Sequence, residues 1–255
     1  MSFIHSIDKS TIPTVNILGV SIAAINMDWL MDFTEKHIKE LSGDYICVSN
    51  VHTTVTSYED ENYRAIQNGG IMAIPDGGPL SSVGRRRGAK KMQRTTGPSY
   101  LMAVLEESQK KGYRHYFYGS TQETLDKMKA FIDRAFPGTQ ISGMYSPPFR
   151  AMTEKEDQEI VSQINVTESD FVWVGLGAPK QEKWMAEHQG RVSGLMVGVG
   201  AAFDYLAGNI KRAPEWMQKC NLEWLYRLIQ NPRRLFKRYL VTNSKYLWYA
   251  VIRGK

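Results

Sequence analysis

Residues 171–184 read FVWVGLGAPKQEKW, and this stretch contains the transition that decides the fold. Phe171–Gly175 is a short apolar run that ends in glycine, which predicts a buried strand. The chain then turns at Gly177 and Pro179, and residues 179–188 have the period of a helix. In open α/β sheets, ligands bind outside the carboxyl ends of the strands. The polar side chains that follow this turn are therefore expected to face a ligand.

The same alternation of strand and helix repeats along the chain. Further strands are predicted at 15–20, 45–49, 71–75, 115–118, 140–143 and 195–199, and helices at 27–41, 53–67, 99–111, 121–135 and 153–165. Thr153 and Glu156 have the spacing of a capping box, and Ser120 could cap the helix that follows it. This alternation predicts an α/β fold with a mostly parallel sheet and helices on both faces. An α+β fold with mixed strands is the alternative.

The pattern changes near residue 210, after which no strand candidate follows. Pro214 can open a helix, and Glu215–Gln230 keeps a helical period. Asn231 and Pro232 break this helix, and a second can run from 233 to 252. We therefore expect an α/β domain over 1–210 and a helical appendage over 211–255.

Charge is distributed unevenly between these two parts. Residues 211–255 contain eleven Lys and Arg but only two acids, Glu215 and Glu223, a net charge of +9. The whole chain carries +6, so the first 210 residues carry −3. Such a segment suits a polyanion or an anionic membrane surface. The alternative is a solvated helix face.

Aromatic side chains alternate with the bases of the appendage. They are Trp224, Tyr226, Phe236, Tyr239, Tyr246, Trp248 and Tyr249. Amphipathic rings beside cations favour the membrane–water interface. The appendage could instead pack on the domain through Leu222, Leu225, Leu228 and Leu235, and both can hold at once. Its apolar side chains could also pack against another subunit, as in a homo-oligomer.

Cysteine use and the first residues indicate the compartment. Cys47 and Cys220 lie in distant segments and form no disulfide framework, which favours a reducing compartment. The opening MSFIHSIDKST lacks the apolar core of a secretory signal. There is no run of about 18 apolar residues that would span a membrane. We therefore expect a cytosolic protein.

One predicted strand end and the basic run that follows it carry charged residues. Asp76, followed by Gly77 and Gly78, comes directly after the strand at 71–75, where a catalytic base is favoured. An ordinary Asp-Gly turn explains it equally well. Residues 84–94, GRRRGAKKMQR, hold six bases and predict either a mobile loop that closes on phosphates or a plain surface loop. Arg94 precedes a Thr-Thr-Gly-Pro sequence and a helix N-terminus, which favours anions.

Two further strand ends carry small or polar residues. Gly119 and Ser120 could cradle a nucleotide phosphate or ribose, or form a generic turn. Asp204, at the end of GVGAAFD, could contact a ligand or cap a helix. Neither GVGAAF nor VGLGAPK has the third glycine of a nicotinamide-dinucleotide fingerprint. The histidines lack zinc spacing, and no Asp-x-Asp pair is evident. Bound phosphates would therefore be neutralised by Arg and Lys rather than by a metal.

Taken together, these motifs resemble the WecG/TagA/CpsF family of bacterial glycosyltransferases, glycosyltransferase family 26. The matching pieces are Asn50, PDGGPL (75–80), QRTTGPSYL (93–101), YFYGST (116–121), VGLGAPKQEKW (174–184), VGVGAAFDYLAGNIKRAPEWMQ (197–218) and NLEWLYRLIQNPRRLFKRYL (221–240). They cover most of the chain in family order.

The resemblance implies a Rossmann-like α/β domain with a C-terminal appendage, in an enzyme at the cytoplasmic face of the membrane. Such enzymes transfer a sugar from a UDP-sugar to a sugar on a polyprenyl diphosphate, with inversion, during cell-surface polysaccharide synthesis. The donor could be N-acetylmannosamine, its uronic acid, glucose or galactose. No cofactor, metal or nucleic-acid partner is implied.

The resemblance also assigns roles to residues. Asp76 falls at the proposed catalytic base, and Arg94 at an arginine for the diphosphate. The implied substrate-binding residues are Asn50, Gly77, Thr96, Gly97, Gly119, Ser120, Gly177, Pro179, Gln181, Glu182 and Asp204. The implied lipid-diphosphate or membrane residues are Arg227, Arg233, Arg234, Lys237 and Arg238. Gln181 is expected to read the base or sugar, and Glu182 either to join that loop or to hold Lys180 or an arginine in place.

Some positions depart from the family pattern, and two rival functions stay open. Gln93 stands where the family often has Glu, and Ser99 where it often has Asp. The basic run at 85–91 is stronger than expected, so the acceptor and the role of this run stay open. The rivals are a nucleic-acid-binding protein that uses the basic tail, and a nucleotide-sugar-binding regulator without turnover. A free Asp has a pKa of about 3.9, so Asp76 is expected to be ionised at neutral pH.

Overall fold

The computed structural model describes residues 7–254, apart from the side chains of Lys219 and Arg234. Residues 1–6, part of the stretch for which the sequence predicts no secretory signal, lie outside the described residues. The described chain is an α/β fold with one eight-stranded sheet in the order β1-β2-β4-β3-β8-β7-β5-β6. Only the β1–β2 pair is antiparallel. The predicted fold class is confirmed.

The elements follow the predicted alternation. The strands are β1 (Thr14–Ile17), β2 (Val20–Ala23), β3 (Tyr45–Ser49), β4 (Met72–Pro75), β5 (Arg114–Gly119), β6 (Gln140–Tyr145), β7 (Phe171–Gly175) and β8 (Leu195–Gly198). The helices are α1 (Met27–His37), α2 (Val51–Glu59), α3 (Glu61–Gly69), α4 (Gly78–Arg86), α5 (Gly97–Lys111), α6 (Gln122–Ala135), α7 (Glu154–Val166), α8 (Lys180–Glu187), α9 (Ala202–Leu206), α10 (Glu215–Lys219), α11 (Glu223–Gln230) and α12 (Pro232–Tyr246). A π-helical segment, Leu247–Ile252, continues α12.

Three predictions of local structure were wrong, each for a local reason. The strand expected at 15–20 is the hairpin β1–β2, because Leu18 and Gly19 both have positive φ (53° and 84°), as a tight hairpin turn requires. The helix expected at 53–67 is two helices, since Asp60 leaves the helical conformation and caps α3. Residues 84–86, expected in a loop, form the last turn of α4.

Smaller differences concern caps and the appendage. Thr121, not Ser120, caps α6, while Thr153 and Glu156 form the predicted capping box of α7. The helix expected over Glu215–Gln230 is split into α10 and α11, because Asn221 between them has φ 58°.

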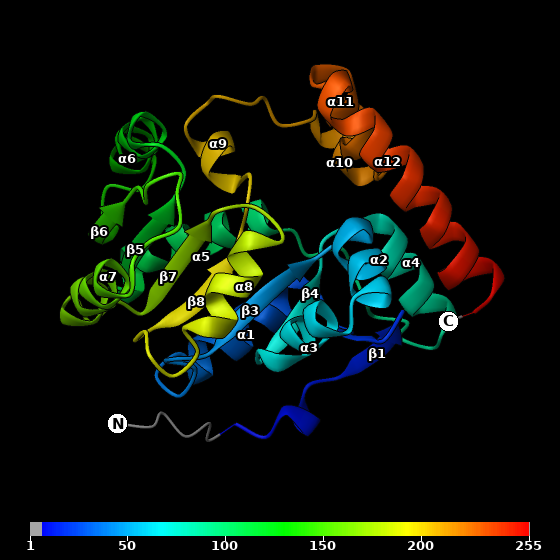
Figure 1. The fold of residues 1–255 in the computed structure, drawn as a ribbon, viewed down its shortest axis with the longest axis horizontal. Coiled ribbons are helices and arrows are strands. Elements are labelled where there is room, and N and C mark those ends of the chain that lie inside the picture. Colours follow the sequence, from blue (N-terminus) through cyan, green and yellow to red (C-terminus); the bar gives the residue numbers. More distant parts are fainter. Residues whose placement is uncertain (1–6, 255) are drawn as a thin grey trace.

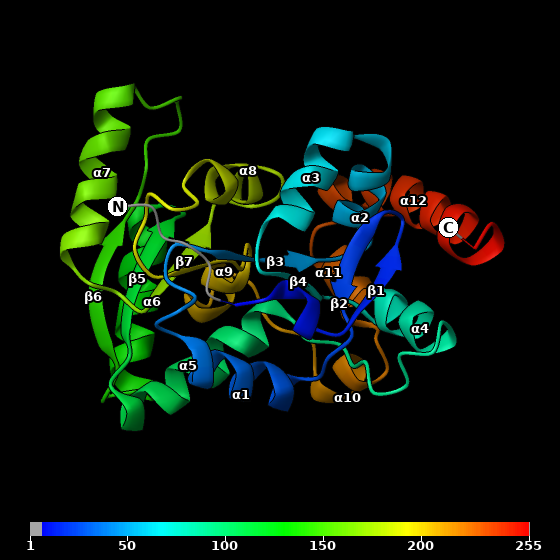
Figure 2. The same cartoon turned by 90° about the horizontal axis from the view of Figure 1, so that it is seen from below.

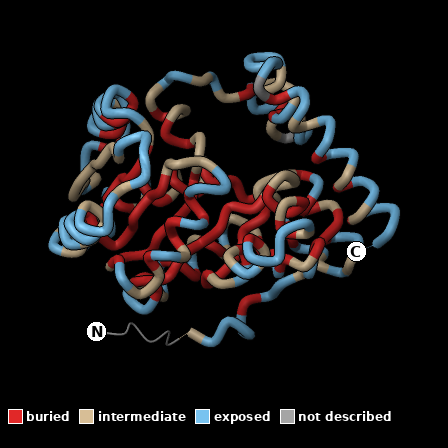
Figure 3. Tube along the Cα trace, in the orientation of Figure 1, coloured by how far each residue is buried: buried red, intermediate tan, exposed pale blue. Residues whose placement is uncertain are grey.

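Both faces of the sheet are covered by helices, and the core lies along its strands (Figures 1, 2 and 3). One face packs against Leu30, Tyr100 and Phe203, and the other against Val55 and Met185. Because a central parallel strand is buried on both sides, its sequence is continuously apolar. This explains why β3 and β7 were predicted with correct bounds.

The carboxyl ends of the parallel strands meet at one edge, which we call the catalytic edge. β5 continues through α6 to β6, whereas the neighbouring β7 continues through α8 toward β8 on its other side. This divergence is the arrangement that opens a ligand crevice in α/β sheets. Gly119 and Gly175 are paired there, and a Cβ on Gly119 would lie 2.7 Å from the Gly175 carbonyl carbon. Only glycine allows the two strand ends to approach so closely.

Helices α10 to α12 follow β8 and α9 at the end of the described chain, and we call them the appendage. α10 and α11 lie over the catalytic edge, and α12 runs down the side of the domain (Figure 1). α12 and its continuation pack on α2, where the Tyr58 and Tyr249 rings are 4.7 Å apart and Lys245 Nζ lies 2.6 Å from Glu59 Oε1. Leu235 is buried, and Leu222, Leu225 and Leu228 are half-buried. Within residues 7–254, no helix is long and apolar enough to cross a membrane.

Candidate active site

The loop between β7 and α8 is held by the side chain of Gln181. The Gly177 amide donates to Gln181 Oε1 over 3.1 Å, and Gln181 Nε2 donates to the Gly198 carbonyl over 3.1 Å. Gln181 is only 4% exposed. It therefore joins the loop after β7 to the end of β8, and Gly177, with φ 78°, provides the turn.

Glu182 is fully buried beneath this loop. Its Oε1 accepts a hydrogen bond of 2.9 Å from Gln181 Nε2. This hydrogen bond joins Glu182 to Gln181, whereas the sequence suggested Lys180 or an arginine as its partner. Burial raises the pKa of Glu182, against the opposing effect of its hydrogen bonds. Glu182 therefore supports Gln181 from below.

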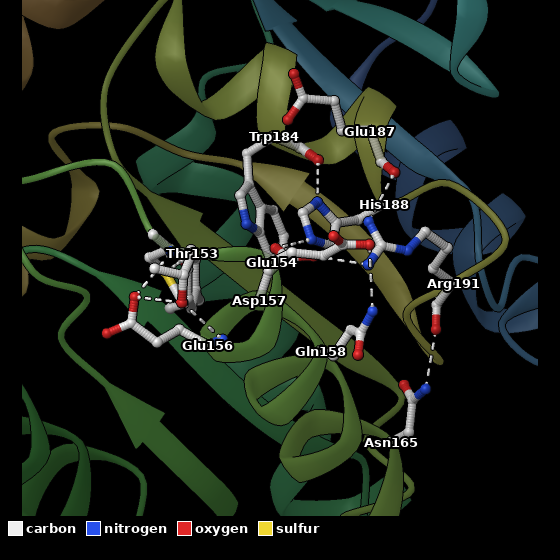
Figure 4. A network of polar contacts seen from close by, with 12 residues as sticks. Thr153, Glu154, Glu156, Asp157, Gln158, Asn165, Trp184, Glu187, His188 and Arg191 are labelled. Carbon is white, nitrogen blue, oxygen red and sulfur yellow. Dashed lines mark hydrogen bonds and ion pairs between the residues drawn. The ribbon is translucent and has the colours of Figure 1, made fainter.

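Helix α8 is anchored to α7 by a charged cluster (Figure 4), and α7 lies on the side of the domain away from the appendage (Figure 1). His188 Nδ1 lies 2.7 Å from the Trp184 carbonyl oxygen, and its Nε2 lies 2.8 Å from Asp157 Oδ1. Arg191 donates to the other oxygen, Asp157 Oδ2, over 2.6 Å. The Trp184 ring stacks between His188 and Tyr118, with centroids 4.1 and 4.4 Å away. These contacts fix α8 and hence the loop before it.

The same cluster borders a cavity of about 730 Å³. The cavity reaches the catalytic edge, where Ser120, Gly175 and Lys180 line it. Ser120 has φ 61°, and its carbonyl accepts from Ser146 Oγ over 2.8 Å. The strand ends of β5 and β7 thus open onto a space large enough for a small ligand.

Asp76 stands at the carboxyl end of β4. Its amide donates to the Ser49 carbonyl of β3 over 2.7 Å, and Gly77, with φ 146°, turns the chain into α4. Burial raises the pKa of Asp76 to about 6; Arg94 opposes this rise most strongly. Glu223 adds to it, and Arg227 and Arg212 also oppose it. Asp76 is thus mostly ionised at neutral pH, as the sequence led us to expect, but its pKa is higher than that of a free Asp because this strand end is covered.

Arg94 forms an ion pair across the junction between domain and appendage. Its Nη2 contacts Glu223 Oε2 at the start of α11, and the two side chains are only 19% and 10% exposed. The Tyr205 hydroxyl lies 3.4 Å from Glu223 Oε1. The sequence analysis missed Glu223. The available signal was that Glu223 is one of two acids in a segment of net charge +9.

Two more arginines reach the same edge. Arg212 donates to Ser99 Oγ over 2.6 Å, and the Arg227 guanidinium lies 5.9 Å from the centre of the Tyr205 ring. Thr96 caps α5 by accepting from the Ser99 amide. Ser99, the position that departs from the family pattern, thus contacts an arginine of the segment before α10.

The remaining sequence candidates are distributed around this edge. Asn50 caps α2 after β3, and its Oδ1 accepts from the His52 and Thr53 amides. Gly97 is buried at the start of α5, where an added Cβ would lie 3.4 Å from Val199 Cα. Asp204 lies within α9 and accepts from Asn209 Nδ2 over 3.2 Å, so it does not cap that helix. Pro179 follows a cis peptide bond and precedes α8.

The residues that the resemblance assigns to the lipid diphosphate or membrane differ in their exposure and lie on α11 and α12. Arg233 and Lys237 are exposed. Arg238 is half-buried. Burial of His52 on α2 lowers the pKa of this histidine, and the positive charge of Arg238 lowers it further. The Arg234 side chain lies outside the described residues. Arg227 is therefore the member of this predicted set that the structure places beside Asp76.

Asp76, with Arg94, Arg212 and Arg227 around it at the carboxyl edge of a parallel sheet, has the composition expected of an enzyme site for an anionic substrate. Comparison with protein families agrees with this class. The model of the glycosyl transferase WecG/TagA/CpsF family matches residues 15–255. The chain belongs to this family and is a glycosyltransferase.

Curated relatives carry one shared name. An N-acetylglucosaminyldiphosphoundecaprenol N-acetyl-beta-D-mannosaminyltransferase of Bacillus subtilis (strain 168) is 30% identical over 224 residues, 87% of this chain and 85% of the relative. Its namesake in Bacillus spizizenii is 29% identical over 78% of this chain and 76% of the relative. That of Staphylococcus aureus (strain MW2) is 23% identical over 89% of each chain.

Proposed function

We propose that this glycosyltransferase moves an N-acetylmannosaminyl group from a UDP-sugar to a sugar on a polyprenyl diphosphate, with inversion. The observation that carries the proposal is Asp76 at the end of β4, surrounded by Arg94, Arg212 and Arg227. The names of the relatives favour N-acetylmannosamine among the donors that the sequence leaves open. They give no support to the nucleic-acid alternative.

In this reaction an acceptor hydroxyl attacks the anomeric carbon of the donor. Asp76 takes the hydroxyl proton, and the bond between the anomeric carbon and the UDP oxygen breaks on the opposite face. The leaving diphosphate gains negative charge, which Arg94 and Arg212, neither of them on α11, stabilise. A half-buried Asp with a pKa of about 6 is a better proton acceptor than a free Asp, and it stays mostly ionised at neutral pH.

We place the nucleotide at the other end of the catalytic edge. β4 and β7 are separated by β3 and β8, which is three strand spacings or about 14 Å. A nucleotide held at the β5 and β7 ends, by the Gly177 loop, Gly119, Ser120 and Asp204, would extend its sugar toward Asp76. Gln181 and Glu182 would act by holding that loop.

We propose that residues 1–210 form the catalytic domain and 211–255 a membrane-binding appendage at the cytoplasmic face. Large apolar side chains are exposed along it, among them Trp224, Ile229, Phe236, Leu240, Leu247 and Ile252. The exposed bases Arg233 and Lys237 lie on α12, as do Phe236 and Leu240. Each base near an anionic surface contributes about 1 kcal/mol. The same apolar side chains would pack against another subunit when no membrane is present.

The first test measures UDP release from a panel of UDP-sugars, with a short-chain lipid diphosphate acceptor and EDTA. Acceptor-dependent turnover with UDP-N-acetylmannosamine is expected. Turnover with another donor alone would correct the sugar. UDP binding without turnover would point to a different acceptor or to a requirement for membrane. If the protein neither binds UDP nor turns over any donor, the proposed function is overturned.

Membrane binding is tested by co-sedimentation with vesicles. Binding to anionic vesicles is expected to exceed binding to neutral ones. It should weaken at high salt and in a variant with Arg233→Gln and Lys237→Gln. Equal binding to both vesicle types would contradict an electrostatic contribution of the appendage.

A further inference from the structure

Glu223 is out of place in a basic appendage. It is one of two acids in residues 211–255, and it is only 8% exposed. Its carboxylate is paired with Arg94 and lies within reach of the Tyr205 hydroxyl. Burial of an unpaired charge destabilises the fold, and even a paired one costs desolvation energy. The presence of this buried ion pair at the edge of the sheet therefore needs a functional reason.

The partner of Glu223 is the arginine assigned to the donor diphosphate. A carboxylate and a phosphate present similar oxygen pairs to the planar guanidinium, and both bind it through charge-assisted hydrogen bonds. Arg94 cannot offer the same N–H groups fully to both. A diphosphate that binds Arg94 therefore competes with Glu223.

We propose that Glu223 is a positioning residue whose carboxylate holds Arg94 in the place of a donor phosphate and is exchanged for that phosphate when the donor binds. The exchange releases the start of α11 from the catalytic edge. The inference rests on the proposed function, because it requires a diphosphate at Arg94.

The charges around the pair explain why exchange moves α11. The groups that face Asp76 are Arg94 from the domain, Tyr205 from α9, Arg212 from the segment before α10, and Glu223 and Arg227 from α11. Once a diphosphate takes Arg94, the Glu223 carboxylate remains buried beside Asp76 without its cation. Repulsion between the two carboxylates and the loss of the pair both favour moving Glu223 out toward water.

The packing at this point makes the movement consequential. Asn221, just before α11, fills the space over Gly78, where an added Cβ would lie 2.4 Å from Asn221 Cγ. The turn between α10 and α11 thus rests directly on the start of α4, two residues after Asp76. Its release uncovers the side of Asp76 that faces the appendage.

The test compares UDP affinity in two variants with the same change of charge. Glu223→Gln removes the competing carboxylate, so UDP is expected to bind about fivefold more tightly, as loss of a modest ion pair would give. Glu215→Gln is the matched control, because Glu215 is the other acid of the appendage and is exposed. Its UDP affinity should be unchanged. Both are measured by calorimetry on the full chain.

A second measurement needs no variant. Hydrogen exchange of the amides in 223–230 is expected to rise when UDP is added to the wild-type chain, whereas the strands stay protected. In Glu223→Gln, exchange in α11 should be high already and should respond little to UDP. Glu223→Asp, which keeps the charge, should restore the response.

The outcomes separate this inference from the proposed function. The replacement of Glu223 by a donor phosphate would be overturned if UDP binding is weaker or unchanged in Glu223→Gln, or if UDP protects α11 amides in the wild type. Either result would leave the glycosyltransferase assignment intact. If Glu223→Gln does not fold, hydrogen exchange of the wild-type α11 amides with and without UDP decides between these outcomes. Absence of UDP binding to the wild type would instead count against the proposed function.

Discussion

The molecule contains two charged clusters that differ in composition and in the parts of the chain that they join. The cluster that joins α7 to α8 is centred on Asp157, whose two carboxylate oxygens are hydrogen-bonded to His188 and Arg191 (Figure 4). The cluster at the catalytic edge has two carboxylates, Asp76 and Glu223, and three arginines, and it spans the junction between domain and appendage.

The two aspartates differ in the direction of their pKa shift. Burial opposes ionisation of Asp157, but hydrogen bonds from Arg191 and His188 outweigh it and hold its pKa below the usual value. At Asp76 burial dominates, and its pKa rises to about 6. A carboxylate that is fully bonded within the chain serves structure, whereas one that is covered but not bonded to its neighbouring cations remains able to take a proton.

The largest effect is expected from Asp76→Asn, which removes the base of the catalytic edge. Turnover should fall by about 10²–10⁴-fold, while UDP affinity stays near that of the wild type. Asp157→Asn is the matched substitution in the other cluster and should retain turnover per folded molecule. Initial rates of UDP release compare the two. Near-normal turnover in Asp76→Asn would remove Asp76 from the mechanism.

Arg94→Ala should have the next largest effect, about 10²-fold on kcat/KM, because it removes a fixed cation from the leaving diphosphate. The corresponding change in the other cluster is Arg191→Ala, which removes a guanidinium from Asp157 and should leave kcat/KM close to normal. Steady-state kinetics on both variants test the contrast. Equal losses would mean that the two clusters do not differ in function.

The pH dependence should report Asp76 and not Asp157. Since Asp76 acts as a base with a pKa of about 6, kcat/KM should fall as the pH is lowered through 6, where the carboxylate becomes protonated. In Glu223→Gln the acid limb should move to lower pH, because a negative charge that raises the pKa of Asp76 is gone. A profile that is flat between pH 5 and about 7 would exclude Asp76 as the titrating base.

The smallest effect on activity, but a measurable one on stability, is expected from Asp157→Asn. It weakens the hydrogen bonds to His188 and Arg191, so the free energy of unfolding should fall by about 1–3 kcal/mol. Urea unfolding measures this change. Asp157 lies on α7, and Glu187→Gln, on the neighbouring helix α8, serves as a control for loss of one negative charge. Unchanged stability in Asp157→Asn would show that the cluster does not anchor α8.

Much of this molecule was predictable from local sequence. The bounds of β3 and β7 follow from their apolar runs, and the position of Asp76 directly after β4 follows from the predicted strand that precedes it. These inferences succeed because a parallel strand carries its burial on both faces in its own sequence, and because its end marks the edge of the sheet. The split of α2 from α3 was missed, since the capping residue Asp60 lies inside a helical period.

The sequence by itself determined the fold class, the catalytic edge and the presence of a basic appendage, because each is written in residues close together along the chain. Only the tertiary structure decided that Glu223 meets Arg94, 129 residues away, that Gln181 and Glu182 are buried, and that Asp76 is covered enough to raise its pKa. The physical reason is that ion pairing and burial depend on how distant segments pack, and the docking of α11 on the edge has no local signature.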